Sequence, residues 1–212
     1  MKKVVKFGGS SLANAEQFQK VGDIIRSEES RRYVVPSAPG KRFSADTKVT
    51  DLLYACYDKA EAGEDFSDIL TEIKSRFYEI IKGLNLDLSL EEEFRQIEAD
   101  FKAHAGNEYA ASRGEFLNGK VMAAYLGYEF IDSATVIRFD KNGISMPIRL
   151  TNFLPNDFRN AKELLFQDFM VEWKMELLRR FQEAVLMLQV LWWQKQFMQI
   201  FMKTGQMFPD SW

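Results

Sequence analysis

Cysteine is almost absent from this chain, whose 212 residues include one, Cys56. A single cysteine excludes an intrachain disulfide and a zinc cluster built on cysteine ligands, and it fits a reduced, cytoplasmic setting. Excess charge is also lacking, because the net charge at pH 7 is only −3. Bulk electrostatics therefore favours neither nucleic acid nor an acidic membrane surface, and no partner of either kind is expected.

Long apolar runs are missing before residue 180, so no segment there is expected to span a bilayer. The opening residues, MKKVVKFGGSS, have only a short apolar run before glycine, which is too short and too early for a signal peptide. Hydrophobic residues make up 46% of the chain and charged residues 28%. This composition is typical of a soluble protein with one large domain or two small ones.

Glycine nearly disappears after Gly143. Eleven of the twelve glycines lie at or before that position, whereas all four tryptophans and seven of the nine methionines lie after it. This break in composition predicts that residues 1–143 and 144–212 are different kinds of sequence.

Residues 1–143 alternate short apolar runs with amphipathic segments. Strands are predicted at KVVKF, which we expect to be buried, and at RYVVPSA, YEFID and ATVIRF. Helices are predicted between them, and two of these helices form a hairpin over about residues 65–103. The order of elements predicts an α/β domain with a largely parallel sheet.

Several local signals support the predicted helices. Capping boxes are expected at Asn14 with Gln17 and at Ser89 with Glu92, and Gly127 is expected to end a helix in the left-handed conformation. The apolar stripes predicted for the helices comprise Phe18, Val21, Ile24 and Ile25; Val49, Leu52, Leu53 and Cys56; Ile69, Ile73, Phe77, Ile80, Ile81 and Leu84; and Phe94, Ile97 and Phe101.

Two loops, FGGSS and PSAPGKR, follow the first two predicted strands. Both leave the carboxyl edge of a parallel sheet, where ligands bind, so we expect them in one crevice. Glycines allow backbone amides to approach an anion, and Lys6 adds a positive charge beside them. The loop does not match the Walker pattern. An ordinary glycine turn and a structural PSAPG turn remain alternatives.

Three further residues have a simple structural interpretation beside any functional one. Glu115, in SRGE, is predicted in the first turn of a helix, where an acid commonly compensates the helix dipole. His104 is expected at the surface or at a helix end rather than as a ligand. Cys56 is expected in the core.

The stretches VVKFGGSSLANAEQFQKV, YVVPSAPGKRFSADTKVTDLLYACY and SRGEFLNGKVMAAYLGYEFIDSATVI resemble the aspartate kinases of the amino-acid kinase family, in the family's order, over about residues 1–143. The resemblance implies a three-layer αβα fold of the carbamate-kinase-like type, incomplete in this chain, with a mostly parallel central sheet. It also implies phosphorylation of the side-chain carboxylate of L-aspartate by MgATP, the entry to lysine, threonine and methionine synthesis.

The resemblance assigns roles to seven residues. Lys6 matches the lysine that stabilises the transferring phosphoryl group, and Gly8, Gly9 and Ser10 match the loop that holds the phosphates. Ser37 and Thr50 match positions that line the aspartate pocket, and Glu115 matches the acid that binds the substrate ammonium. The implied partners are L-aspartate, ATP and Mg²⁺, without a metal site of the protein's own. Intact family members are expected to be homo-oligomers.

The chain departs from the family after Gly143, because the Arg-Gly-Gly-Ser-Asp motif is missing. A shifted reading frame joins the third base of each codon to the first two bases of the next codon. From Arg180 onward, allowed codon choices then encode FSRGGSDVTGSLVAKA, which contains the missing motif. In the same way LLFQDFMV yields AVIPGFYG, a segment typical of the family. Some letters are forced: Trp192 with Trp193 requires valine, and Met202 with Lys203 requires glutamate. Residues 144–212 are therefore interpreted as a frameshifted tail.

Other interpretations of the tail and of the function stay open. The tail could be an amphipathic, Trp-rich helix that binds a membrane surface or a partner, which would make the chain a non-catalytic interaction protein. Arg179, Arg180, Glu183, Lys195 and Lys203 interrupt it too often for a clean membrane span. Another amino-acid kinase with a different acid substrate is the third alternative, although KVTDLL and SRGE favour the aspartate branch.

Overall fold

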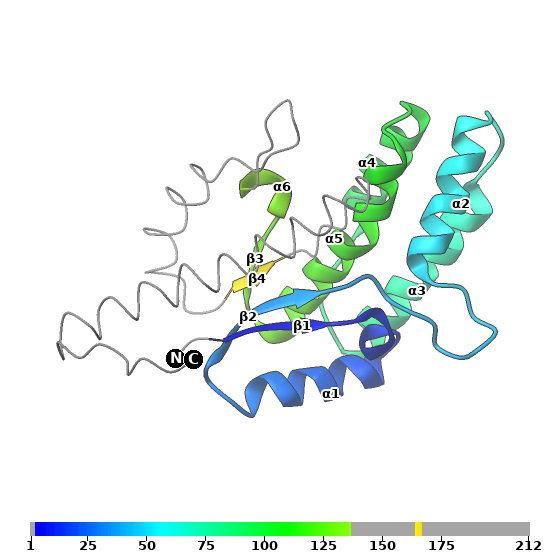
Figure 1. Ribbon diagram of the computed structural model, residues 1–212. Helices are drawn as coiled ribbons and strands as arrows, with labels where there is room; N and C mark the ends of the chain where they lie inside the picture. The colour runs from blue at the N-terminus through cyan, green and yellow to red at the C-terminus, as the bar shows by residue number, and fades with distance from the viewer. Residues whose placement is uncertain (1–2, 137–163, 167–212) are drawn as a thin grey trace, which may run out of the picture. The chain divides into compact units, whose positions relative to one another are not determined.

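A four-stranded parallel sheet organises the chain in the computed structural model, which describes residues 3–136 and 164–166 (Figure 1). Its strands are β1 (Lys3–Phe7), β2 (Arg31–Pro36), β3 (Glu129–Ile131) and β4 (Leu164–Phe166), in the order β1-β2-β4-β3. Every pair of neighbours is parallel, which confirms the predicted α/β class. All the described residues lie in the first of the two units into which the chain divides, Met1–Val171.

The first strand is less buried than predicted. Among the described strands β1 lies at one end of the sheet, paired only with β2. Lys3, Val4 and Lys6 are exposed, and Val4 retains 42% of its accessible surface. Strands buried on both faces need a neighbour on each side and layers above and below, so the expectation of a buried KVVKF strand is wrong within the described residues.

Helix α1 (Ala15–Arg26) connects β1 to β2 and follows the predicted start signal. The side chain of Asn14 accepts a hydrogen bond of 3.0 Å from the backbone N–H of Gln17, which satisfies one of the free amides of the first turn. Three members of the predicted stripe, Phe18, Val21 and Ile25, are buried. The fourth, Ile24, is 48% exposed and does not share the buried face of the helix.

Helix α5 (Asn107–Leu126) is the central helix of the described structure. Eleven of its residues are buried, and they lie on several faces of the helix. The helix packs against β2, β3 and β4. It also contacts α1, where Arg26 donates to the backbone carbonyl of Tyr125 over 3.1 Å. Gly127 ends the helix at φ 72°, which confirms the predicted left-handed cap.

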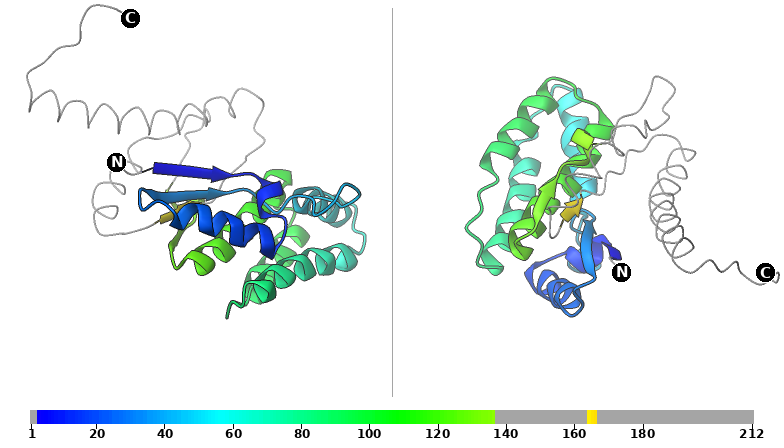
Figure 2. Two further views of the ribbon diagram at one scale, coloured as in Figure 1. Left: turned by 90° about the horizontal axis from the view of Figure 1, so that it is seen from below. Right: turned by 90° about the vertical axis from the view of Figure 1, so that its left-hand side faces the viewer.

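The described helices α1 and α5 cover one face of the sheet. They contact each other and both contact β2, and Figure 2 shows both on the same side of the strands. This arrangement follows from right-handed crossovers that move in one direction along the sheet. The expected second helical layer of the three-layer fold is not among the described residues, so this part of the prediction stays untested. No helix of the described part is long and apolar enough to cross a bilayer.

The remaining long helices are α2 (Val49–Glu61), α3 (Ser67–Gly83) and α4 (Glu91–Lys102), of which α3 and α4 form the predicted hairpin. The rings of Phe77 and Phe94 join the two helices edge to face, with centroids 6.1 Å apart. The buried stripes agree with the prediction, except that Ile69 is only half-buried and Leu70 is buried.

Two local predictions are wrong. Helix α4 begins after Leu90 without a side-chain cap, so Ser89 and Glu92 do not form the predicted capping box; the Ser89 hydroxyl accepts from the N–H of Glu91 instead. The predicted strand ATVIRF begins as a helical turn, α6 (Ser133–Val136), where the side chain of Asp132 accepts from the N–H of Ala134. An aspartate in this position competes with an extended backbone. The rest of ATVIRF lies outside the described residues.

Candidate functional site

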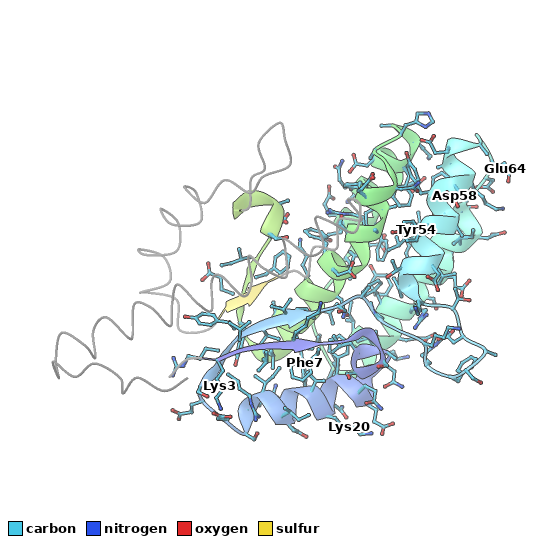
Figure 3. The ribbon with its side chains drawn as sticks, in the orientation of Figure 1. Lys3, Phe7, Lys20, Tyr54, Asp58 and Glu64 are labelled. Atoms are coloured by element: carbon cyan, nitrogen blue, oxygen red, sulfur yellow. The ribbon has the colours of Figure 1, made fainter. Side chains whose placement is uncertain are left out.

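The FGGSS loop leaves the carboxyl end of β1 and turns at once into a short 3-10 helix, η1 (Gly9–Leu12). Phe7, the last residue of β1, is labelled in Figure 3. The N–H of Ser11 donates to the carbonyl of Gly8 over 3.0 Å. The first amides of a helical turn, here those of Gly9 and Ser10, have no acceptor within the turn and are suited to an anion. Lys6 is exposed two residues before Gly8.

The second loop packs directly against the first. The N–H of Ser37 donates to the carbonyl of Phe7 over 3.0 Å, and the N–H of Gly40 donates to the carbonyl of Gly9 over 2.8 Å. A Cβ on Gly40 would lie 2.6 Å from the carbonyl carbon of Gly9, which leaves no room for a side chain. The structure therefore brings FGGSS and PSAPGKR together, as the sequence predicts.

Glu115 reaches the second loop from the middle of α5, not from a first turn. Helix α5 begins at Asn107 and continues through SRGE without a break, so the predicted helix start is wrong. Dipole compensation thus cannot explain this acid. Glu115 is 5% exposed, and its Oε1 accepts from the N–H of Ala38 over 3.3 Å. A buried carboxylate requires strong partners, which makes Glu115 a candidate for binding a cation.

The close approach of the second loop to α5 depends on Gly114. A Cβ on this residue would lie 2.7 Å from the Cβ of Ala38, so the glycine allows the loop to reach Glu115. The start of α2 joins the same place, because the N–H of Val49 donates to the carbonyl of Pro39 over 3.2 Å. Thr50 follows in the first turn of α2 and is half-buried.

Asn118 is a site residue that the sequence reasoning missed. It is fully buried, and its Nδ2 donates to the carbonyl of Ser37 over 2.6 Å. Among the described residues, its Oδ1 has no hydrogen-bond partner. Asn118 stands three residues after Glu115 and hence on the same face of α5, a spacing that could have identified it.

A buried ion pair, also missed, lies beneath the second loop. Arg76 of α3 is 3% exposed, and its Nη2 lies 3.4 Å from Oδ2 of Asp46. Arg42 donates to Asp46 from its backbone N–H over 2.8 Å and from Nη2 over 3.0 Å. The hydrogen bonds from Arg42, with the charge of Arg76 added, hold the pKa of Asp46 well below its usual range, while burial lowers the pKa of Arg76.

Residues at the far end of α2 are separate from this site. His104 is exposed and its Nδ1 lies 2.7 Å from Oε1 of Glu61, in agreement with the predicted surface position. Two surface hollows in the described part are lined there by residues that include Glu64, which Figure 3 labels beyond the end of α2. Cys56 is buried as predicted, and burial raises the pKa of its thiol to about 12, so it is not a nucleophile.

The site as a whole combines three chain segments: the turn at Gly8–Ser10, the loop at residues 37–40 and the buried face of α5 at residues 114–118. The turn offers amides to an anion, and the helix offers a carboxylate to a cation. Such a site can position an anionic and a cationic group of two reactants, which is what group transfer between charged molecules requires.

The sequence pattern described as "Amino acid kinase family" matches residues 1–172 of the chain. Aspartokinase 3 of Bacillus subtilis is 35% identical over 178 residues, which cover 80% of this chain and 39% of the Bacillus protein. Aspartokinase 1, chloroplastic, of Arabidopsis thaliana is 33% identical over 139 residues, 58% of this chain and 23% of that protein. The chain thus spans well under half the length of these relatives.

Solved structures give the same likeness. The crystal structure of Clostridium acetobutylicum aspartate kinase superposes with a TM-score of 0.73 at 42% identity, over 79% of this chain and 39% of that one. That of E. coli aspartokinase III in complex with aspartate and ADP superposes with a TM-score of 0.63 at 22% identity, over 79% of this chain and 40% of that one. The second comparison bears on the fold alone.

Proposed function

Because the chain belongs to the amino acid kinase family, we propose that it carries the aspartate-binding and phosphate-binding part of an aspartate kinase. The reaction transfers the terminal phosphoryl group of ATP to the side-chain carboxylate of L-aspartate, which gives 4-phospho-L-aspartate. The observation that supports this most is Glu115, a buried acid held against the loop that follows β2. A cationic partner suits such an acid, and the substrate of this enzyme carries an ammonium group.

Glu115 would bind that ammonium group, and Ser37 and Thr50 would line the rest of the pocket. Ser37 and Thr50, both half-buried, adjoin Ala38 and Val49, whose side chains lie against Gly114. Asn118 holds the backbone of Ser37 in place through its 2.6 Å hydrogen bond. A carboxylate substrate is already a nucleophile at neutral pH, so the pocket needs to position it and needs no general base.

The amides of Gly8, Gly9 and Ser10 would hold the nucleotide phosphates, and Lys6 would neutralise charge on the group in transfer. The residues fit this task, because a Cβ on Gly8 would meet no atom of the described residues within 4 Å, which leaves space in front of the turn. Mg²⁺ would supply charge neutralisation on the phosphates when it is bound together with ATP.

The relatives above 30% identity support the substrate as well as the fold. The Clostridium protein is an aspartate kinase, and the Bacillus protein is an aspartokinase. We propose L-aspartate and ATP as the ligands of this chain, in a cytoplasmic enzyme of amino-acid biosynthesis that leads to lysine, and a homo-oligomer for intact members of the family.

Residues 144–212 are, in this proposal, a frameshifted tail that replaces the missing Arg-Gly-Gly-Ser-Asp motif. They lie outside the described residues apart from β4, and the family match extends into them as far as residue 172. The motif's arginine and aspartate are charged groups that orient the reactants, and contacts of this type contribute about 1.5–3 kcal/mol each. We therefore expect little or no turnover from this chain.

A coupled assay of ADP release tests the activity. The chain should show little L-aspartate-dependent release, and a chain whose coding frame is restored near the Gly143 codon should show it strongly. Normal turnover by the unrestored chain would overturn the frameshift proposal, as would a coding sequence in which no single-base change near that codon restores the motif. Release that depends on L-glutamate instead of L-aspartate would assign the restored protein to another branch of the family.

A membrane-binding or partner-binding tail is the competing proposal. Its residues, Arg179–Lys203, lie outside the described residues. Co-sedimentation with liposomes that is abolished by replacing Trp192 and Trp193 would favour it over the frameshift.

A further inference from the structure

Arg76 is a charged residue on the apolar face of a helix. It stands three residues after Ile73 and four before Ile80, both of which are buried, so the geometry of α3 turns it toward the core. Its side chain is 2% exposed. A guanidinium group keeps its charge in proteins and is costly to bury, so its position requires several compensating contacts.

Those contacts lie on the backbone of residues 40–47, which begin within the second loop and continue toward α2. Nη2 donates to the carbonyl of Gly40 over 2.6 Å, and Nη1 donates to the carbonyl of Thr47. Asp46, between these two residues, supplies the opposite charge. One planar guanidinium therefore bridges both ends of the segment 40–47, which a single ammonium group cannot do in the same geometry.

The Gly40 end of this segment leads to the phosphate turn. The carbonyl of Gly40 accepts from Arg76, while its N–H donates to the carbonyl of Gly9 over 2.8 Å. The two glycines are in such close contact that a Cβ on Gly9 would lie 3.1 Å from the nitrogen of Gly40. A displacement of Gly40 would consequently move the turn whose amides face the nucleotide phosphates.

The Thr47 end leads to the substrate pocket. Thr47 precedes Lys48, the N-cap of α2, whose side chain makes no capping hydrogen bond. Arg76 thus holds the backbone just before a helix start that lacks the usual side-chain cap. Thr50 lies in the first turn of that helix, so its position depends on the same anchor.

We propose that Arg76 is a positioning residue for the kinase site, which couples the phosphate turn at Gly8–Ser10 to the start of α2 through the backbone of residues 40–47. The proposal rests on the proposed function for the identity of the ligands. The helical hairpin α3–α4, which supplies Arg76, thereby supports the site from outside the sheet.

The test compares Arg76→Met with Lys74→Met in the full chain. Lys74 lies on the same helix and is replaced with the same loss of charge, but it pairs with Glu91 of α4 over 3.7 Å and not with the loop. Hydrogen exchange is followed by mass spectrometry in peptides that cover residues 8–12, 40–49 and 117–126, and ADP binding is followed by titration.

Arg76→Met should speed exchange in residues 8–12 and 40–49 by about tenfold or more, with residues 117–126 unchanged, and weaken ADP binding by a similar factor. Lys74→Met should leave both loops and ADP binding as in the wild type. Arg76→Lys should give intermediate exchange, and it serves as the test if Arg76→Met does not fold.

The proposal would be overturned if residues 8–12 exchanged at the wild-type rate in the Arg76 variants. Exchange that is faster by the same factor in all three peptides would also overturn it, because that result indicates a purely structural role. Failure of the proposed function is a separate result. If the wild-type chain does not bind ADP, the nucleotide assignment fails, whereas the exchange comparison still decides whether Arg76 controls the turn.

Discussion

The backbone N–H of Ala38 donates a hydrogen bond of 3.3 Å to Oε1 of Glu115, residues that are 77 positions apart in the chain. This bond joins the loop after β2 to the middle of the central helix. It places a buried carboxylate at the edge of the sheet where the phosphate turn also lies. The proposed aspartate pocket is built around this relationship.

An added methyl group should destabilise the chain at Gly40 and have almost no effect on stability at Gly8. In Gly40→Ala the new Cβ meets the backbone of Gly9 at 2.6 Å, and because backbone cannot easily give way we expect a loss of about 1–3 kcal/mol in the free energy of unfolding. In Gly8→Ala the Cβ meets no atom within 4 Å in the part of the chain that the structure describes, and φ is an ordinary −75°, so stability should change by less than about 0.5 kcal/mol. Urea unfolding measures both.

The Gly8→Ala variant should still bind ADP more weakly than the wild type, because the methyl group occupies space in front of the turn. Equal stability of the two variants would contradict the packing of the two loops. Unchanged ADP affinity in Gly8→Ala would contradict the phosphate role of the turn.

Asn118→Asp should destabilise the chain although the side chain keeps its size. An ionised carboxylate cannot donate to the carbonyl of Ser37, and it adds a second acid three residues from Glu115. The loss expected for an unsatisfied buried group is about 1–3 kcal/mol in the free energy of unfolding. Gln96→Glu, an exposed change of the same kind beside Asp100, is the control and should cost under about 0.5 kcal/mol. Similar losses in both variants would argue against the hydrogen bond to Ser37.

Asp46→Asn should reveal the ion pair through the pH dependence of stability. The pKa of Asp46 is lowered in the folded chain, so its ionised form stabilises the fold above the unfolded-state pKa, near 3.8. This contribution is lost as the pH falls through the folded-state pKa. The difference in the free energy of unfolding between wild type and Asp46→Asn should hence be constant from about pH 5 to 8 and shrink below about pH 4.

Urea unfolding at several pH values measures this difference. Glu16→Gln, at an exposed pair with Lys20, should show almost no such effect, because exposed pairs are screened by solvent. A difference that grows as the pH falls would show that Asp46 is not stabilised in its charged form.

The sequence predicted the parts of the fold that depend on local pattern. The strands KVVKF and RYVVP, the cap at Asn14 and the end at Gly127 follow from residue types and periodicity. The meeting of FGGSS and PSAPGKR also follows, because the carboxyl ends of parallel strands share one edge. These predictions needed no knowledge of tertiary packing.

What the sequence missed depends on contacts between distant segments. Glu115, in SRGE, was predicted in the first turn of a helix, but α5 begins at Asn107 and Glu115 lies in its middle. Arg76 was not identified, because only the position of residues 40–47 makes this charged residue of an apolar helix face an internal anchor. Ile24 continued an apolar stripe that no described neighbour covers.

Recognition of the ammonium group of L-aspartate by Glu115 can be tested by comparison with succinate, because succinate has the same two carboxylates and no amine. Titration of the full chain by calorimetry or NMR should show that the wild type prefers L-aspartate by about tenfold or more, and that Glu115→Gln removes this preference. Equal binding of the two ligands by the wild type, or an unchanged preference in Glu115→Gln, would show that Glu115 does not recognise the ammonium group.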